Sequence, residues 1–160
     1  MEAQHTARKP GREHDRLFLQ RRDVSIKQTE KPWGREVLWA HTDKYAGKIL
    51  HINEGESLSL QYHEEKDETI YVLDGKMVFT YRQSHSVEGI EELRITLRAG
   101  EKVSIPPRVI HRMEAVYGPV VLLEVSTPEL DDVTRLSDRY GRCYEEAAGK
   151  SDNKSEEVGE

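Results

Sequence analysis

The stretch that decides the fold is SLSLQYHEEKDETIYVLDG, residues 57–75. Its first seven residues alternate between polar and apolar, which is the period of a β-strand whose two faces have different surroundings. One face would carry Ser57, Ser59, Gln61 and His63, and the other Leu58, Leu60 and Tyr62. Because the polar face holds an imidazole and an amide, we expect this strand to line a polar cavity.

Short strand-like runs continue on both sides of this stretch. They are bounded by Gly, Pro, Asn and Asp at the spacing typical of an all-β sandwich or barrel. The expected strands cover residues 35–40, 45–52, 57–63, 68–73, 76–82, 92–97, 102–105, 110–116 and 119–126. Helical periodicity is plausible only after Glu129. Since closing or doubling a sheet removes exposed edges, a barrel or jelly roll is favoured over an open sheet.

Composition limits the classes of function. A chain of 160 residues with 36% hydrophobic content fits one domain with one modest core. The net charge of -6 gives no basic footprint for nucleic acid. No apolar run approaches the roughly 20 residues of a membrane span, and the N-terminus lacks the apolar segment of a secretory signal. The single cysteine, Cys143, excludes an intrachain disulfide framework, so we expect a cytoplasmic protein.

Both ends of the chain are predicted to be tails. Residues 1–26 are poor in large apolar side chains except around Leu17–Leu19, which could dock on a partner subunit. Residues 27–144 form the expected barrel with a C-terminal extension, and residues 145–160 form an acidic tail expected to be disordered. A homodimer is expected.

Four residues form a candidate metal site. They are Gln61, His63, Glu68 and His111. Two imidazoles, a carboxylate and an amide oxygen suit one divalent ion among Zn, Mn, Fe, Co and Ni, with Zn or Mn favoured. The alternative is a polar end of the barrel that is satisfied by water.

The spacing of these residues resembles the two sequence motifs of the cupin superfamily. The first motif matches at Gly55, His63, Glu68 and Gly75, with Gln61 in place of its first histidine. The second motif matches at Gly100, Pro106 and His111, but Arg108 replaces its glycine and Ala115 its asparagine. The resemblance implies a cupin double-stranded β-helix, which is a jelly-roll barrel, and a bound metal.

Further segments resemble one branch of the cupins. Residues 31–39, 58–63 and 122–142 are similar to the cupin domain of bifunctional mannose-6-phosphate isomerase/mannose-1-phosphate guanylyltransferases. This resemblance implies a metal-dependent aldose–ketose isomerase acting on a sugar phosphate. The chain has no room for a nucleotidyl-transferring domain, so guanylyltransfer is not expected. Lys66, Thr69 and Ile70 depart from the family, which normally has Arg, His and Trp there.

Other residues are assigned to substrate and catalysis. Glu124 or a metal-bound water is the expected base, and Glu124, Lys48 and Arg142 are the catalytic candidates. Lys48, Arg108, Arg112 and Arg142 would bind the anionic end of the substrate, although each taken singly could be an ordinary surface residue. A cupin oxygenase or lyase with the same metal set, or a non-catalytic sugar-binding barrel, are the alternatives.

Overall fold

The computed structural model describes residues 26–83 and 92–142. Every regular element in these ranges is a β-strand, so they contain no helix that could cross a membrane. The strands are β1 (Lys27–Lys31), β2 (Gly34–His41), β3 (Ala46–Ile52), β4 (Leu60–Tyr62), β5 (Glu68–Asp74), β6 (Lys76–Gln83), β7 (Leu93–Arg98), β8 (Lys102–Ile105), β9 (Val109–Glu114), β10 (Val120–Ser126) and β11 (Thr134–Ser137).

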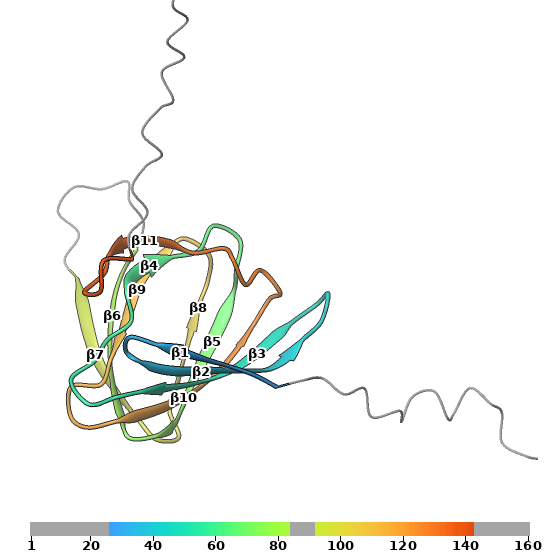
Figure 1. Ribbon diagram of the computed structural model, residues 1–160. Coiled ribbons are helices and arrows are strands. Elements are labelled where there is room, and N and C mark those ends of the chain that lie inside the picture. Colours follow the sequence, from blue (N-terminus) through green and yellow to red (C-terminus); the bar gives the residue numbers. More distant parts are fainter. Residues whose placement is uncertain (1–25, 84–91, 143–160) are drawn as a thin grey trace, which may run out of the picture.

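The strands form two antiparallel sheets that enclose the interior (Figure 1). The six-stranded sheet has the order β1-β2-β3-β10-β5-β8, and the five-stranded sheet has the order β11-β4-β9-β6-β7. Strands far apart in sequence are therefore neighbours, as in the pairing of β10 with both β3 and β5. This arrangement confirms the predicted all-β jelly-roll class.

Alternating residues of the two inner faces build the core. In β10, every second residue from Val120 to Ser126 is buried, and the residues between them are more exposed. The core cluster consists of Trp33, Leu50, Ile52, Ile70, Val72, Met77, Phe79, Ile105, Met113, Ala115, Val120 and Leu122. The same alternation places Lys48 and Glu124 on the inward face of the six-stranded sheet, where both are buried.

The structure differs from the sequence-based expectations in three places. The strand expected at 57–63 is shorter, since β4 covers only Leu60–Tyr62 and Ser57 makes one isolated bridge to Glu114. No helix follows Glu129 in the described part, where β11 pairs with β4 instead. β1 was not predicted, because its sequence KQTEK has no large apolar residue.

Several predictions about the ends fall outside the described ranges. The N-terminal tail up to residue 25, with the docking segment Leu17–Leu19, is one of them. The acidic C-terminal tail and Cys143 are the others.

We expect Gly34→Ala to lower the free energy of unfolding by about 2–4 kcal/mol. Gly34 has φ of +141°, and a Cβ there would lie 2.0 Å from the carbonyl oxygen of His51 on the adjacent strand. Urea denaturation of the variant measures this loss. The control is Gly55→Ala, because Gly55 also has a positive φ, +79°, but open space around its Cα. Gly55→Ala should lower the free energy of unfolding by about 1 kcal/mol. Equal losses for the two variants would contradict the steric argument.

Candidate metal centre

Three buried side chains from both sheets converge on one point. His63 directly follows β4, Glu68 opens β5 in the other sheet, and His111 lies in β9. Glu68 Oε1 lies 3.1 Å from His111 Nε2 and 3.6 Å from His63 Nε2. One possible ligand atom from each residue lies within 4.8 Å of the other two. The three atoms are thus close enough to share one ion.

Backbone carbonyl groups fix the orientation of both imidazoles. His111 Nδ1 lies 2.9 Å from the carbonyl oxygen of Val109, and His63 Nδ1 contacts the carbonyl oxygen of Asp132. Because a carbonyl oxygen only accepts hydrogen bonds, we assign the proton of each ring to Nδ1. Each Nε2 then presents a lone pair toward Glu68.

The three converging atoms fit a cation. His63 Nε2, His111 Nε2 and Glu68 Oε1 are buried and have no hydrogen-bond partner among the described residues. Buried acceptors that face one another are unfavourable unless a positive group compensates them. Two imidazole nitrogens and one carboxylate oxygen suit a divalent metal such as Zn, Mn, Fe, Co or Ni.

Gln61 lies in β4, two residues before His63. It pairs directly with His111 between β4 and β9, so both side chains share the inward face. Its Oε1 accepts a hydrogen bond of 2.7 Å from Ser59 Oγ. A carbonyl oxygen has a second lone pair, so this bond is compatible with the predicted role of Gln61 as a fourth ligand.

A buried lysine connects Glu68 to Glu124. Lys66 Nζ lies 2.6 Å from Glu68 Oε2 and 2.7 Å from Glu124 Oε1. Burial alone lowers the pKa of Lys66, but the carboxylates of Glu124 and Glu68 outweigh it and raise that pKa. Burial alone raises the pKa of Glu68, but its neighbours, the Lys66 ammonium among them, hold it well below its usual range. Lys66 thus occupies Oε2 and leaves Oε1 facing the imidazoles.

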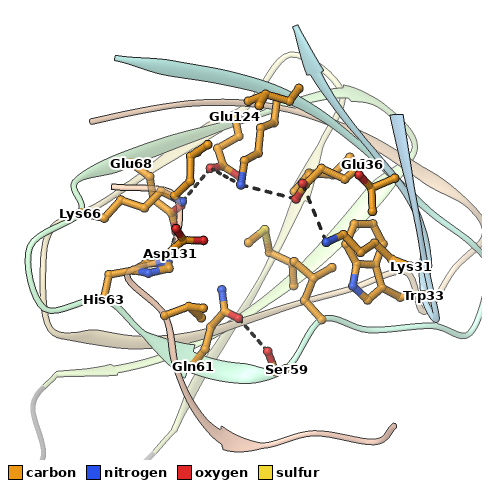
Figure 2. A pocket seen from close by; sticks show the side chains of 18 of the residues that line it. Lys31, Trp33, Glu36, Ser59, Gln61, His63, Lys66, Glu68, Glu124 and Asp131 are labelled. Atoms are coloured by element: carbon orange, nitrogen blue, oxygen red, sulfur yellow. Dashed lines mark hydrogen bonds and ion pairs between the residues drawn. The ribbon is translucent and has the colours of Figure 1, made fainter. Parts of the chain in front are cut away.

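The charges continue in alternation across the six-stranded sheet (Figure 2). Lys48 Nζ lies 3.8 Å from Glu124 Oε1 and 3.4 Å from Glu36 Oε2. Lys31 Nζ of β1 lies 3.9 Å from Glu36 Oε1. Each carboxylate in this row therefore lies between two cations or between a cation and the candidate metal centre.

These groups line a cavity of about 500 Å³. Its lining residues come from both sheets and from the segment between β10 and β11. They are Lys27, Thr29, Lys31, Trp33, Glu36, Leu38, Lys48, Leu50, Leu58, Ser59, Gln61, His63, Lys66, Glu68, Met113, Glu124, Leu130, Asp131, Val133, Arg135 and Arg142. The volume is within the range of small-molecule sites.

The structure separates the three arginines that were expected to bind substrate. Arg108 has a positive φ of 67°, and its side chain is 71% exposed and paired with Glu64. Arg112 follows His111 in β9, so its side chain lies on the opposite face from the imidazole. Only Arg142 lines the cavity.

Asp138 holds Arg142 in place. Its carboxylate accepts hydrogen bonds from Arg142 Nε at 2.9 Å, Arg142 Nη2 at 2.6 Å and the Arg142 backbone N–H at 2.8 Å. These bonds lower the pKa of Asp138 to about 2. The guanidinium of Arg142 also lies over the ring of Tyr140. Arg142 is therefore oriented, but its charge is largely compensated.

Sequence reasoning assigned no role in the site to Lys66 or Asp132. Lys66 is two positions before Glu68, so the alternation of β5 extended backward would have placed both on one face. Asp132 accepts hydrogen bonds from the backbone N–H groups of Glu64, Glu65 and Lys66, and so shapes the loop that carries the site. No local pattern indicates that contact, since the partners are more than 60 residues apart.

Comparisons with known proteins identify the family. Residues 48–126 match the family described as cupin domain. The mannose-1-phosphate guanylyltransferase of Escherichia coli K12 is 32% identical over 120 residues, which are 72% of this chain and 23% of that relative. The protein of the same name from Salmonella typhimurium gives the same identity and coverage. The chain thus spans about a quarter of the length of the curated relatives it matches.

Solved structures share the fold at low identity. The capsular polysaccharide assembling protein CapF of Staphylococcus aureus has a TM-score of 0.61 at 19% identity, covering 71% of this chain and 32% of its own. Oxalate decarboxylase of Bacillus subtilis has a TM-score of 0.60 at 14% identity, covering 70% of this chain and 30% of its own. Such similarity shows the fold alone. The family match shows that residues 48–126 of this chain form a cupin domain.

Proposed function

We propose that the protein is a metal-dependent aldose–ketose isomerase that acts on a sugar phosphate of the mannose-6-phosphate type. The observation that carries the proposal is the convergence of His63 Nε2, Glu68 Oε1 and His111 Nε2, without hydrogen-bond partners among the described residues, beside a cavity lined by cations. The curated relatives named as mannose-1-phosphate guanylyltransferases support a phosphorylated sugar as the ligand.

In this proposal, His63, Glu68 and His111 hold one divalent ion, with Gln61 as a fourth ligand and Zn or Mn favoured. Such an ion would polarise the carbonyl of a bound sugar. Isomerisation also needs a group that removes a proton from the carbon next to the carbonyl and returns it to the neighbouring carbon. Glu124 is the proposed base.

The neighbours of Glu124 suit this role in part. Lys66 and Lys48 compensate its charge and fix its position. Lys48 could also donate to an oxygen of the substrate, and Arg142 could bind its anionic end. Both lysines lie against the same oxygen, Oε1, which a substrate proton would also have to reach. That feature favours a non-catalytic sugar-binding barrel as the second candidate.

The test is a coupled assay of the metal-loaded protein with mannose-6-phosphate. We expect fructose-6-phosphate to form, and Glu124→Gln to reduce kcat by about 10²- to 10⁴-fold with unchanged metal content. Glu65→Gln is the control, because Glu65 is exposed and outside the cavity. Retained metal without interconversion of any hexose or pentose phosphate would refute the isomerase. Sugar-dependent stabilisation would then favour the binding barrel, and Fe(II)-dependent oxygen uptake the cupin oxygenase.

The cytoplasmic location and the homodimer remain predictions.

A further inference from the structure

One row of side chains runs from the metal centre to the edge of the five-stranded sheet. Arg135 of β11 pairs directly with Gln61 of β4, and Gln61 pairs directly with His111 of β9. Directly opposed residues of antiparallel strands share a face. Arg135 and Gln61 both line the cavity, which agrees with this geometry. Arg135 is therefore an inward-facing residue in line with the metal centre.

The charge of Arg135 is uncompensated in the described part of the chain. The lysines that alternate with Glu124 and Glu36 in the cavity each have a carboxylate within 4 Å. Lys66 has Glu68, for example, and Lys48 has Glu36. Arg142 has Asp138. Arg135 has no ion pair or hydrogen-bond partner among the described residues, and its Nε is buried. A buried guanidinium N–H without a partner is unfavourable, so an anion that accepts from it would stabilise the site.

Lys27 adds a second free cation. It lies in β1, the edge strand of the six-stranded sheet, and it lines the same cavity. No ion pair of Lys27 with a described residue is found. Four carboxylates line the cavity: Glu36, Glu68 and Glu124, each of which is paired with a lysine, and Asp131. The lining as a whole holds six lysines and arginines against four carboxylates, so the cavity has a net positive charge.

Strand spacing gives the position of Arg135 relative to the candidate metal centre. Neighbouring strands lie about 4.8 Å apart, so the Cα atoms of Arg135 and His111, two strands apart, are separated by about 10 Å. A ligand that reaches from one residue to the other needs a polar oxygen at one end and an anion at the other. A sugar whose phosphate and carbonyl are at opposite ends meets that requirement.

We propose that Arg135, assisted by Lys27, forms the subsite for the phosphate group of the substrate. This inference rests on the proposed function for the identity of the sugar. A guanidinium fork matches two phosphate oxygens, and the free N–H groups of Arg135 can make this bidentate contact. Arg142, whose Nε and Nη2 already donate to Asp138, has a secondary role.

The test is calorimetric titration of the metal-loaded protein with mannose-6-phosphate, mannose, mannuronate and inorganic phosphate. Arg135→Gln is expected to weaken binding of mannose-6-phosphate by about 10- to 100-fold and to leave the metal content unchanged. Arg135→Lys should retain part of the affinity. Arg98→Gln is the matched control, since Arg98 is exposed on β7 and does not line the cavity. Thermal unfolding of each variant shows whether it is folded.

The outcomes separate this inference from the isomerase. Binding of mannose-6-phosphate that depends on Arg135 supports the subsite even if no turnover occurs. Arg135-dependent binding of inorganic phosphate, without binding of the sugar phosphate, keeps the subsite and refutes the assigned sugar. The subsite is refuted if Arg135→Gln binds mannose-6-phosphate as tightly as the wild type or if only Arg142→Gln weakens it. Equal affinity for mannuronate and mannose-6-phosphate would refute a phosphate subsite in favour of a carboxylate subsite. If neither mannose-6-phosphate nor inorganic phosphate binds, the subsite is also refuted.

Discussion

His111→Ala is expected to abolish stoichiometric metal binding. His111 is completely buried, and its Nε2 is one of the three atoms that converge without hydrogen-bond partners in the described part of the chain. Alanine leaves at most Gln61, His63 and Glu68 as ligands. Because even the outer partners of metal ligands are worth about 10- to 100-fold in affinity, loss of a ligand should weaken metal binding by at least about 100-fold.

Elemental analysis and calorimetric titration with Zn²⁺ and Mn²⁺ measure the effect. His51→Ala is the matched control, because His51 lies on β3 outside the cavity, with its Nδ1 3.5 Å from Arg35 Nη2. The control should bind metal as the wild type does. If His111→Ala folds and still binds one equivalent of metal with unchanged affinity, then His111 is not a ligand, and the convergence of the three atoms needs another explanation.

The inward faces of the long strands could be predicted because burial there follows a period of two residues. Lys48 alternates with Leu50 and Ile52, and Glu124 alternates with the outward-facing Leu123 and Val125. In each case the local pattern is enough to place the side chain inside. The position of these residues relative to one another was not predictable, since β3 and β10 are separated by most of the barrel in sequence.

The missed parts depend on contacts between distant segments. β1 and β11 are edge strands with few apolar residues, and they exist because β2 and β4 offer hydrogen bonds to them. The loop that carries Lys66 is held by Asp132, which caps three of its backbone N–H groups. A local pattern carries no information about such a partner. The helical periodicity that was plausible after Glu129 was misleading for the same reason, since β11 forms there.

Arg135 shows the same limit within the site. Its strand is too short for a clear alternation, and its inward direction follows only from its pairing with Gln61. Arg108, in contrast, lies in a sequence motif and was expected to bind substrate, yet its side chain is directed to solvent. Proximity to a motif in sequence is therefore a weaker guide to the cavity than register across the sheet.

Lys66→Met is expected to lower the free energy of unfolding by about 3–5 kcal/mol in metal-free protein. The substitution keeps the length of the side chain but removes the charge that compensates Glu68 and Glu124, which are 2% and 4% exposed. Lys48 is left as the neighbouring cation of Glu124, at 3.8 Å. Urea denaturation in the presence of a chelator measures the loss. Lys102→Met is the control, because Lys102 is exposed on β8.

A second substitution distinguishes an ion pair from simple packing. Glu124→Gln removes one of the two carboxylates, so Lys66→Met should cost less in that background. We expect a coupling energy of about 1–3 kcal/mol between the two positions. Additive losses would mean that Lys66 does not stabilise the fold through Glu124, and Glu68 would then be its electrostatic partner.

Metal should reduce the cost of Lys66→Met. A divalent ion at His63, Glu68 and His111 would compensate the Glu68 carboxylate from the Oε1 side, whereas Lys66 compensates it from the Oε2 side. The ion would replace part of the compensation that the variant has lost, and binding to the folded state stabilises it. With saturating Zn²⁺, the difference in unfolding free energy between variant and wild type should therefore be smaller than with chelator. An equal loss in both conditions would show that Lys66 and the metal do not share Glu68. The buried lysine would then act on Glu124 alone.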